Sequence, residues 1–179
     1  MSTLGIIPET LTDFEVYQNN NNNGRLLGIV DVTLPNLQAM TNTVKGTGIA
    51  GEIDAPVVGH FGSITMTLTW QAIVESLIDL VTPNGLTLDL RGNLQNWDKT
   101  QAIATQKAVK IVVQGRSKNL DLGKLEAATA MGTSLEIEVT YIKISLDGKE
   151  VIEVDKFNNK YVLNGTDYAA DIRKNLGLE

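Results

Sequence analysis

A glycine-rich run in this sequence matches a known cofactor-binding pattern. Gly46, Gly48 and Gly51 have the GxGxxG spacing of dinucleotide-binding turns. That chemistry needs a buried strand before the glycines and, after them, a helix whose N-terminus faces the pyrophosphate. Here residues 41–45 are polar, and Pro56 would fall inside the second turn of a following helix. We therefore expect a flexible glycine-rich arm and no cofactor.

The other reactive residue types do not form a recognisable catalytic or metal-binding set. His60 is the single histidine and the chain has no cysteine, which excludes multi-histidine and cysteine-based metal sites. Asp54, Asp89 and Asp98 are acids of the kind used in acid–base catalysis, but the sequence gives them no common face. We expect no catalytic residue, no metal ion and no enzymatic activity.

Composition predicts a soluble single domain across residues 1–179. The chain is 42% hydrophobic and 20% charged, which is ordinary for a globular protein. It lacks both an apolar run of roughly 18 residues and the basic start of a signal peptide, so we expect no membrane insertion. Fifteen Lys and Arg against 21 Asp and Glu give a net charge of −6, with no basic stripe. Tight DNA binding is therefore not expected, although DNA could pass an acidic surface without sticking.

Strand patterns dominate the chain and predict a mainly β fold. Residues 63–69 alternate strictly between polar and apolar types, and residues 86–90 and 135–141 repeat the alternation. A period of two is typical of strands with one buried face. The glycine-containing pair Asp147-Gly148 then predicts a tight hairpin turn.

The register expected for that hairpin places apolar residues on both of its faces. A two-residue turn would pair Leu146 with Lys149, Ile144 with Val151, and Ile142 with Glu153. Such a hairpin is usually buried inside its own domain, but a neighbouring subunit could also cover it.

Two helices are predicted. Apolar residues at helical spacing favour a helix over residues 69–81, packed on a sheet. A short C-terminal helix is expected within residues 166–176, because Thr166-Asp167 can cap its start and Gly177 can end it.

Two stretches look like excursions from the domain. Residues 19–23 are five asparagines between apolar segments, which indicates an elongated hairpin tip. Residues 41–62 are rich in glycine, yet they carry Val44, Ile49, Ile53, Val57 and Phe61. A structureless loop of this length is uncommon in a compact domain, so its apolar content argues for a partner.

A series of short motifs runs along nearly the whole chain: Asp31-Val-Thr-Leu-Pro35, Leu90-Arg91-Gly92, Gly115-Arg116, Leu120-Asp121-Leu-Gly123, Tyr141-Ile-Lys143-Ile, Ile152-Glu-Val-Asp155, Asn164-Gly165 and Leu176-Gly-Leu178. In this order they resemble the motifs of the major tail tube proteins of P2-like contractile-tailed phages and their R-type bacteriocin relatives. The run at residues 19–23 and the stretch at 127–131 depart from the family pattern.

The resemblance implies two packed antiparallel sheets with one flanking helix and a long extended loop. It implies a virion protein that forms hexameric rings, which stack into the inner tube of a contractile tail and conduct DNA. Residues 41–62 would protrude to the adjacent ring, with an inter-ring interface at Val44, Ile49, Ile53, Val57 and Phe61. The partners would be further copies of the chain, the tail sheath, the tape measure, and baseplate or terminator proteins. We also expect acids among Asp89, Glu136 and Glu138 to face the lumen.

Two other functions stay open from the sequence. A bacteriocin or other contractile injection device would need the same subunit without a genome to conduct. A β-sandwich module that binds a carbohydrate or protein ligand would predict clustered exposed aromatic residues, and the nine aromatic residues of this chain do not cluster.

Overall fold

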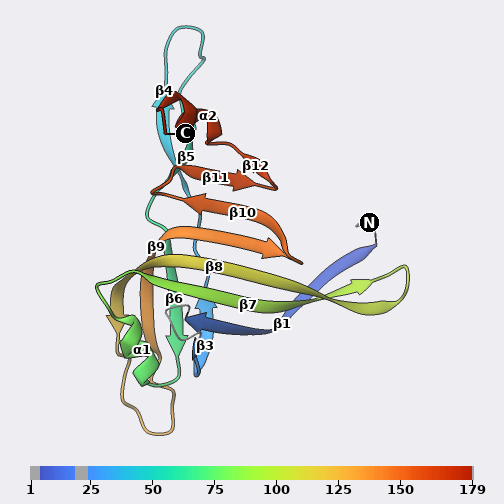
Figure 1. Ribbon diagram of the computed structural model, residues 1–179, viewed down its shortest axis with the longest axis vertical. Coiled ribbons are helices and arrows are strands. Elements are labelled where there is room, and N and C mark those ends of the chain that lie inside the picture. Colours follow the sequence, from blue (N-terminus) through green and yellow to red (C-terminus); the bar gives the residue numbers. More distant parts are fainter. Residues whose placement is uncertain (1–4, 19–23, 179) are drawn as a thin grey trace.

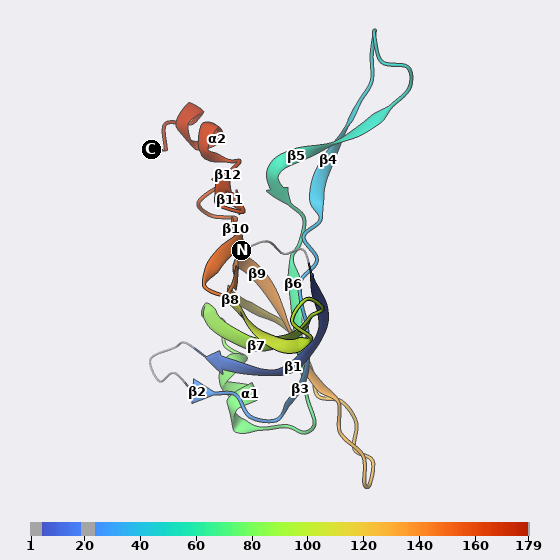
Figure 2. The ribbon, with the colours of Figure 1, turned by 90° about the vertical axis from the view of Figure 1, so that its right-hand side faces the viewer.

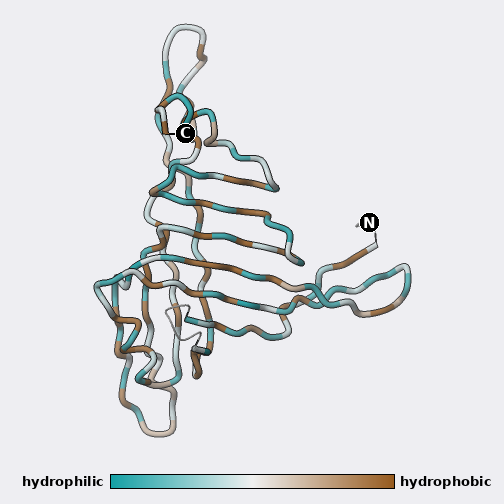
Figure 3. The backbone as a smooth tube through the Cα atoms, in the orientation of Figure 1, coloured by the Kyte–Doolittle hydropathy of each residue, from teal (hydrophilic) through white to brown (hydrophobic). Residues whose placement is uncertain are grey.

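Long strands form most of the structure because apolar and polar residues alternate along most of the chain (Figure 3). The computed structural model describes residues 5–18 and 24–178. In chain order its elements are β1 (Ile6–Gln18), β2 (Gly24–Arg25), β3 (Ile29–Thr33), β4 (Ala39–Val44), β5 (Ile53–Phe61), β6 (Thr65–Trp70), α1 (Glu75–Leu80), β7 (Leu86–Asp98), β8 (Ile103–Asp121), β9 (Thr133–Leu146), β10 (Lys149–Asp155), β11 (Lys160–Leu163), β12 (Thr166–Asp167) and α2 (Ala170–Asn175). The asparagine tip predicted at residues 19–23 lies outside the described residues.

One antiparallel sheet contains ten of the strands. Its main order is β12-β11-β10-β9-β8-β7-β1-β2, and β6 joins through β9 and then pairs with β3 (Figure 1). The strands β4 and β5 form a separate two-stranded sheet. The sheet bends over itself at β8 and β9, so that β3 and β6 with the first half of β9 form one layer and β1 and β7 form the facing layer around the core (Figure 2). The predicted mainly β, antiparallel fold with packed layers is confirmed.

The bend is located at an extra residue in β9. Gln114 pairs with Tyr141 and Gly115 with Val139, so Thr140 has no opposite residue in β8. Such a bulge bends a strand and increases its twist. Before the bulge β9 pairs with β6, and after it β9 pairs with β10. A single strand thus belongs to both layers.

Gly115 is required at this bend by close backbone contact. A Cβ built at Gly115 would lie 2.3 Å from the carbonyl oxygen of Glu138 and 2.9 Å from the side chain of Ile137. We expect Gly115→Ala to destabilise the fold by about 1–3 kcal/mol, measured by denaturant unfolding. Gly85→Ala is the matched control, because the nearest atom to its new Cβ would be 3.9 Å away. Equal stability of the two variants would contradict this account of the bend.

The core contains the apolar positions that the sequence pattern selects. Met66 and Leu68 of β6, and Leu135 and Ile137 of β9, are all 0% exposed. The facing layer contributes three buried residues of β7, namely Leu86, Leu88 and Leu90. The three alternating segments predicted from the sequence are therefore confirmed as strands with one buried face.

The predicted register of the β9–β10 hairpin is wrong beyond its turn. Leu146 does pair with Lys149, but Ile144 pairs with Ile152 and Ile142 with Val154, because the ladder shifts at Val151. The shift places the four apolar partners on one face, where Ile142 and Val154 are 2% and 1% exposed. Lys143 then lies opposite Glu153 on the other face. The hairpin is thus apolar on one side only, and its own core covers that side.

Both helices are shorter than predicted. The predicted helix over residues 69–81 is confined to Glu75–Leu80, because the alternation of β6 continues through Trp70. The inner face of α1 is buried at Leu77 and Leu80. The predicted C-terminal helix over 166–176 is confined to Ala170–Asn175, and Thr166–Asp167 forms β12. Within the described ranges no helix has the length and hydropathy needed to cross a membrane.

Candidate assembly surfaces

The segment predicted as a protruding loop is a β-hairpin. In its strands Val44 pairs with Ile53, and the Thr43 hydroxyl donates to Asp54 Oδ1 at 2.8 Å. Val44 and Ile53 are neighbours on one face and are 39% and 56% exposed. The hairpin extends away from the body (Figure 2). It therefore presents an apolar pair that its own chain leaves uncovered.

The five residues predicted for the inter-ring interface have two different environments. Val44, Ile53 and Val57 are exposed strand residues, and Ile49 lies in the turn region between the strands. Phe61 lies at the base, where its ring packs edge-on against Tyr161 with the centroids 5.1 Å apart. Phe61 therefore contributes to the attachment of the hairpin to its own subunit.

Polar contacts fix the base of the hairpin to the body. The Gly62 N–H donates to the carbonyl of Gln38 at 3.1 Å, and Lys156 Nζ donates to the carbonyl of Gly62 at 2.7 Å. The adjacent Ser63 hydroxyl donates to Glu138 Oε2 at 2.6 Å. The direction of the hairpin is thus set by β9 and by the end of β10.

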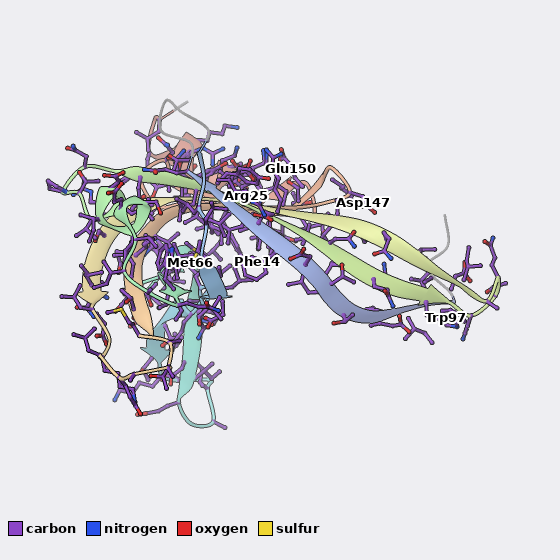
Figure 4. All side chains as sticks on the ribbon, turned by 90° about the horizontal axis from the view of Figure 1, so that it is seen from below. Phe14, Arg25, Met66, Trp97, Asp147 and Glu150 are labelled. Atoms are coloured by element: carbon purple, nitrogen blue, oxygen red, sulfur yellow. The ribbon has the colours of Figure 1, made fainter. Side chains whose placement is uncertain are left out.

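A second extension is an arm made of residues 6–13, 92–98 and 103–109, which prolong β1, β7 and β8 beyond the body (Figure 4). Trp97 lies near its far end, well away from the core residue Met66. Ile7 pairs with Trp97 across the strands, and both are exposed. This arm was not predicted from the sequence. It forms because the β7–β8 ladder continues without a break from Leu86 to Asp98.

An apolar groove lies where the arm leaves the body. Its volume is about 260 Å³ and it opens to solvent. It is lined by apolar residues of the arm, of the sheet and of the segment after β3: Leu11, Phe14, Val32, Leu34, Leu90, Leu94, Val109 and Ile111. Leu11 and Leu34 are 47% and 50% exposed, so this face of the sheet is incompletely covered.

Asp89, the first of the acids expected to face the lumen, is paired with cations. Its Oδ2 lies 2.8 Å from Arg91 Nη2 and 3.3 Å from Lys110 Nζ. The Arg91 guanidinium also stacks 5.1 Å from the centre of the Tyr17 ring. Asp89 is only 8% exposed, and its Oδ1 is buried without a hydrogen-bond partner among the described residues.

The other two acids share one lysine. Lys118 Nζ lies 3.2 Å from Glu136 Oε1 and 3.5 Å from Glu138 Oε2. Burial raises the pKa of Glu138, but the hydrogen bond from Ser63, the N–H of Ile64 and two lysines together lower it below its ordinary value. The structure thus brings Glu136 and Glu138 together and places Asp89 in a separate cluster on β7 and β8.

The pKa values of three carboxylates predict that acid weakens the fold. Burial raises the pKa of Glu153, but hydrogen bonds from Lys160 and Tyr141 lower it overall. The pKa of Asp167 is likewise lowered by Arg173 against the effect of burial, as for Glu138. Carboxylates with a lowered folded pKa stabilise the fold above their unfolded pKa, and this contribution is lost as pH falls through the folded value. Thermal unfolding should therefore occur at progressively lower temperature below about pH 5.

Glu153→Gln tests this pH dependence. It keeps a hydrogen-bond acceptor for Tyr141 but removes the charge paired with Lys160. We expect a loss of about 1 kcal/mol at pH 7 and a smaller further loss between pH 5 and pH 3 than in the unsubstituted protein. The prediction would be wrong if both proteins lost stability in parallel over that range.

The described residues contain no group of three His, Asp or Glu side chains that could hold a metal ion. A β-sandwich with its own core, an exposed apolar hairpin and an arm beside an apolar groove has the surfaces of a protein that associates with others.

The chain belongs to the phage tail tube protein FII family, whose model matches residues 8–177. It is 26% identical over 153 residues to the tail tube protein of Escherichia phage P2, covering 82% of this chain and 86% of the relative. It is also 26% identical over 173 residues to the major tail tube protein of Serratia phage KSP20, covering 96% and 98%. The resemblance predicted from the sequence motifs is confirmed. The protein is a structural component of the virion that assembles into a tail tube, and not an enzyme.

Proposed function

We propose that this protein forms hexameric rings that stack into the inner tube of a contractile phage tail and conduct DNA during delivery. Both relatives described above are phage proteins, which supports a phage tail over a bacteriocin. The other proposed partners are the tail sheath, the tape measure, and baseplate or terminator proteins. DNA would pass through the tube without tight binding, because the net charge of −6 per subunit repels phosphates.

The observation that carries this proposal is the exposed Val44–Ile53 pair on a two-stranded hairpin. A lone hairpin is at best marginally stable in water, and exposing an apolar pair on it adds an unfavourable contribution. A second layer supplied by another ring removes both problems. We assign the inter-ring interface to Val44, Ile49, Ile53 and Val57 on the hairpin, with Phe61 fixing its base.

The open edge of β1 supports ring closure by strand pairing. In the described part of the chain, β2 pairs with this edge only at Tyr17 and Gln18, which leaves the outward-pointing N–H and C=O groups of residues 6–15 without a strand partner, while the inward-pointing groups bond to β7. Such an edge is a liability in a monomer and a template for pairing in an assembly. Neighbouring subunits would thereby join their strands into one wall around the lumen.

Negative-stain electron microscopy of the purified protein tests the assembly. We expect rings with six-fold symmetry and tubes of uniform diameter. Size-exclusion chromatography with light scattering provides the parallel measure of mass per particle. Monomers of 19.4 kDa at every concentration and salt condition would refute the proposal.

We further propose that Asp89, Glu136 and Glu138 face the lumen. Glu136→Lys tests this on the one acid of the three that neither lies buried beneath Arg91 and Lys110, as Asp89 does, nor accepts the Ser63 hydrogen bond at the hairpin base, as Glu138 does. Tubes should still form, but particles carrying them should eject DNA more slowly because added positive charge attracts phosphates. Normal delivery through such tubes would remove Glu136 from the lumen.

A further inference from the structure

The groove beside the arm is an apolar sheet face that lacks its second layer. Over the body, β6 and β9 cover β7 and β8. Toward the arm this cover ends near β3, and Leu34 follows its last residue. Beyond that point Leu11 and Leu94, which pair across β1 and β7, face the open groove. Among the described residues nothing covers this face.

The β4–β5 hairpin is a layer whose apolar face has no sheet to pack on within the described part of the chain. It is a thin layer with one apolar face, formed by the Val44–Ile53 pair, and one polar face, formed by Thr43 and Asp54. It cannot fill the groove of its own chain, because Figures 1 and 2 both place it at one end of the molecule and β3 with the base of the arm toward the other. Its base is also fixed by Lys156 and Gly62.

We propose that the apolar face of the β4–β5 hairpin of one copy packs into the groove beside the arm of a second copy. This rests on the proposed tube function and names the surface that the hairpin meets. Two apolar sheet faces pack about 10 Å apart and complete a sandwich between copies.

Charge at the two surfaces agrees with this pairing. Glu52 and Asp54 flank Ile53 on the hairpin. Lys107 pairs with Leu94 on the groove side of the arm and has no ion pair in the described structure, whereas the Arg91 guanidinium is held by Asp89 on the opposite face of β7. Placing the acids beside Lys107 would add attraction at the rim, where charges steer association.

The contact is heterologous, since a hairpin meets a groove and not another hairpin. Each copy carries one of each, so the contact repeats from copy to copy without closing on a pair. Such a contact gives a closed ring or an open series, according to the rotation between copies. Between stacked rings the series stays open, which is the behaviour required for a tube that grows by adding rings.

Disulfide cross-linking tests the contact, because the natural chain has no cysteine. Ile53→Cys places a thiol on the hairpin, Leu11→Cys places one in the groove, and Leu125→Cys places one on the exposed loop after β8 as a control. Single-cysteine proteins are mixed pairwise, assembled, oxidised and run on non-reducing gels. We expect I53C with L11C to give a species of twice the 19.4 kDa monomer mass. I53C alone, and I53C with L125C, should give little.

The double variant I53C/L11C adds a sharper readout. Contacts between copies should give a ladder of cross-linked dimers, trimers and higher species, whereas contact within one chain would leave a monomer. Tubes that form normally, with I53C cross-linking to L125C or to itself but not to L11C, would overturn the inference and leave the proposed function intact. Failure of the unsubstituted protein to assemble would overturn both.

Discussion

Shortening the β4–β5 hairpin is expected to abolish tube growth and to leave the subunit folded. Thr41 and Pro56 are directly opposite in the ladder, so residues 42–55 can be replaced by Asn-Gly, a pair that favours two-residue hairpin turns. The shortened hairpin keeps its attachment through Gly62 and Lys156. It loses Val44 and Ile53, which we propose to bury against a neighbouring copy. Electron microscopy should show rings or smaller species and no long tubes.

A full-length variant separates loss of apolar contact from loss of length. Val44→Thr with Ile53→Thr keeps the strands, because threonine also favours extended backbone, but removes most of the apolar face. It should block tube growth nearly as strongly as the deletion. Circular dichroism and thermal unfolding should match the unsubstituted protein. Long tubes formed by either variant would show that the hairpin is not needed for stacking.

Trp70→Ala is expected to cost about 3–5 kcal/mol of folding stability, among the largest effects of any single substitution in this chain. Trp70 ends β6 at 0% exposure, and its backbone pairs with Ile29 on one side and Thr133 on the other. Removal of its side chain would leave a cavity in the hydrophobic core, because strand side chains project from the face of the sheet. Denaturant unfolding followed by circular dichroism measures the change.

The second tryptophan provides a matched control. Trp97 is 38% exposed near the end of the arm, so Trp97→Ala should change stability by less than about 1 kcal/mol. Trp70→Phe is a further control, because the Trp70 Nε1 is buried without a partner in the described structure and its loss offsets part of the lost volume. A Trp70→Ala variant as stable as Trp97→Ala would contradict the assignment of Trp70 to the core.

The sequence predicted the strands well because alternation directly reflects burial on one face. Residues 63–69 and 135–141 show this most clearly, since their apolar positions form the core. The helix predicted over residues 69–81 is wrong for residues 69–74, since α1 begins only at Glu75. Trp70 fits both a helical stripe and the alternation of Met66 and Leu68. Its backbone pairs with Ile29 and Thr133, and this pairing places it in the strand.

Bulges were not predictable for a related reason. An extra residue such as Thr140, or the shift at Val151, changes the register without changing the local residue pattern. The choice of register depends on which alignment buries Ile142 and Val154 together. That depends on the opposite layer, which a single-sequence pattern does not contain.

The candidate assembly surfaces were predicted in part. Apolar residues in a glycine-rich stretch pointed to the hairpin, because such residues need a partner wherever the stretch leaves the core. The groove was not predictable, since Leu11, Leu34 and Leu94 come from three separate segments. Cation pairing of Asp89 and Glu138 was missed for the same reason, because Lys110 and Lys118 approach them across strands.

The path of β8 and β9 through both layers has a mechanical consequence. In a sandwich made of two separate sheets, a shearing force is resisted only by side-chain contacts between the layers. Here β9 pairs with β6 in one layer and with β10 in the other, and β8 accompanies it around the bend. A force applied at the end that bears the hairpin is therefore transmitted to the opposite layer through covalent backbone, which stiffens the subunit against shear between its layers.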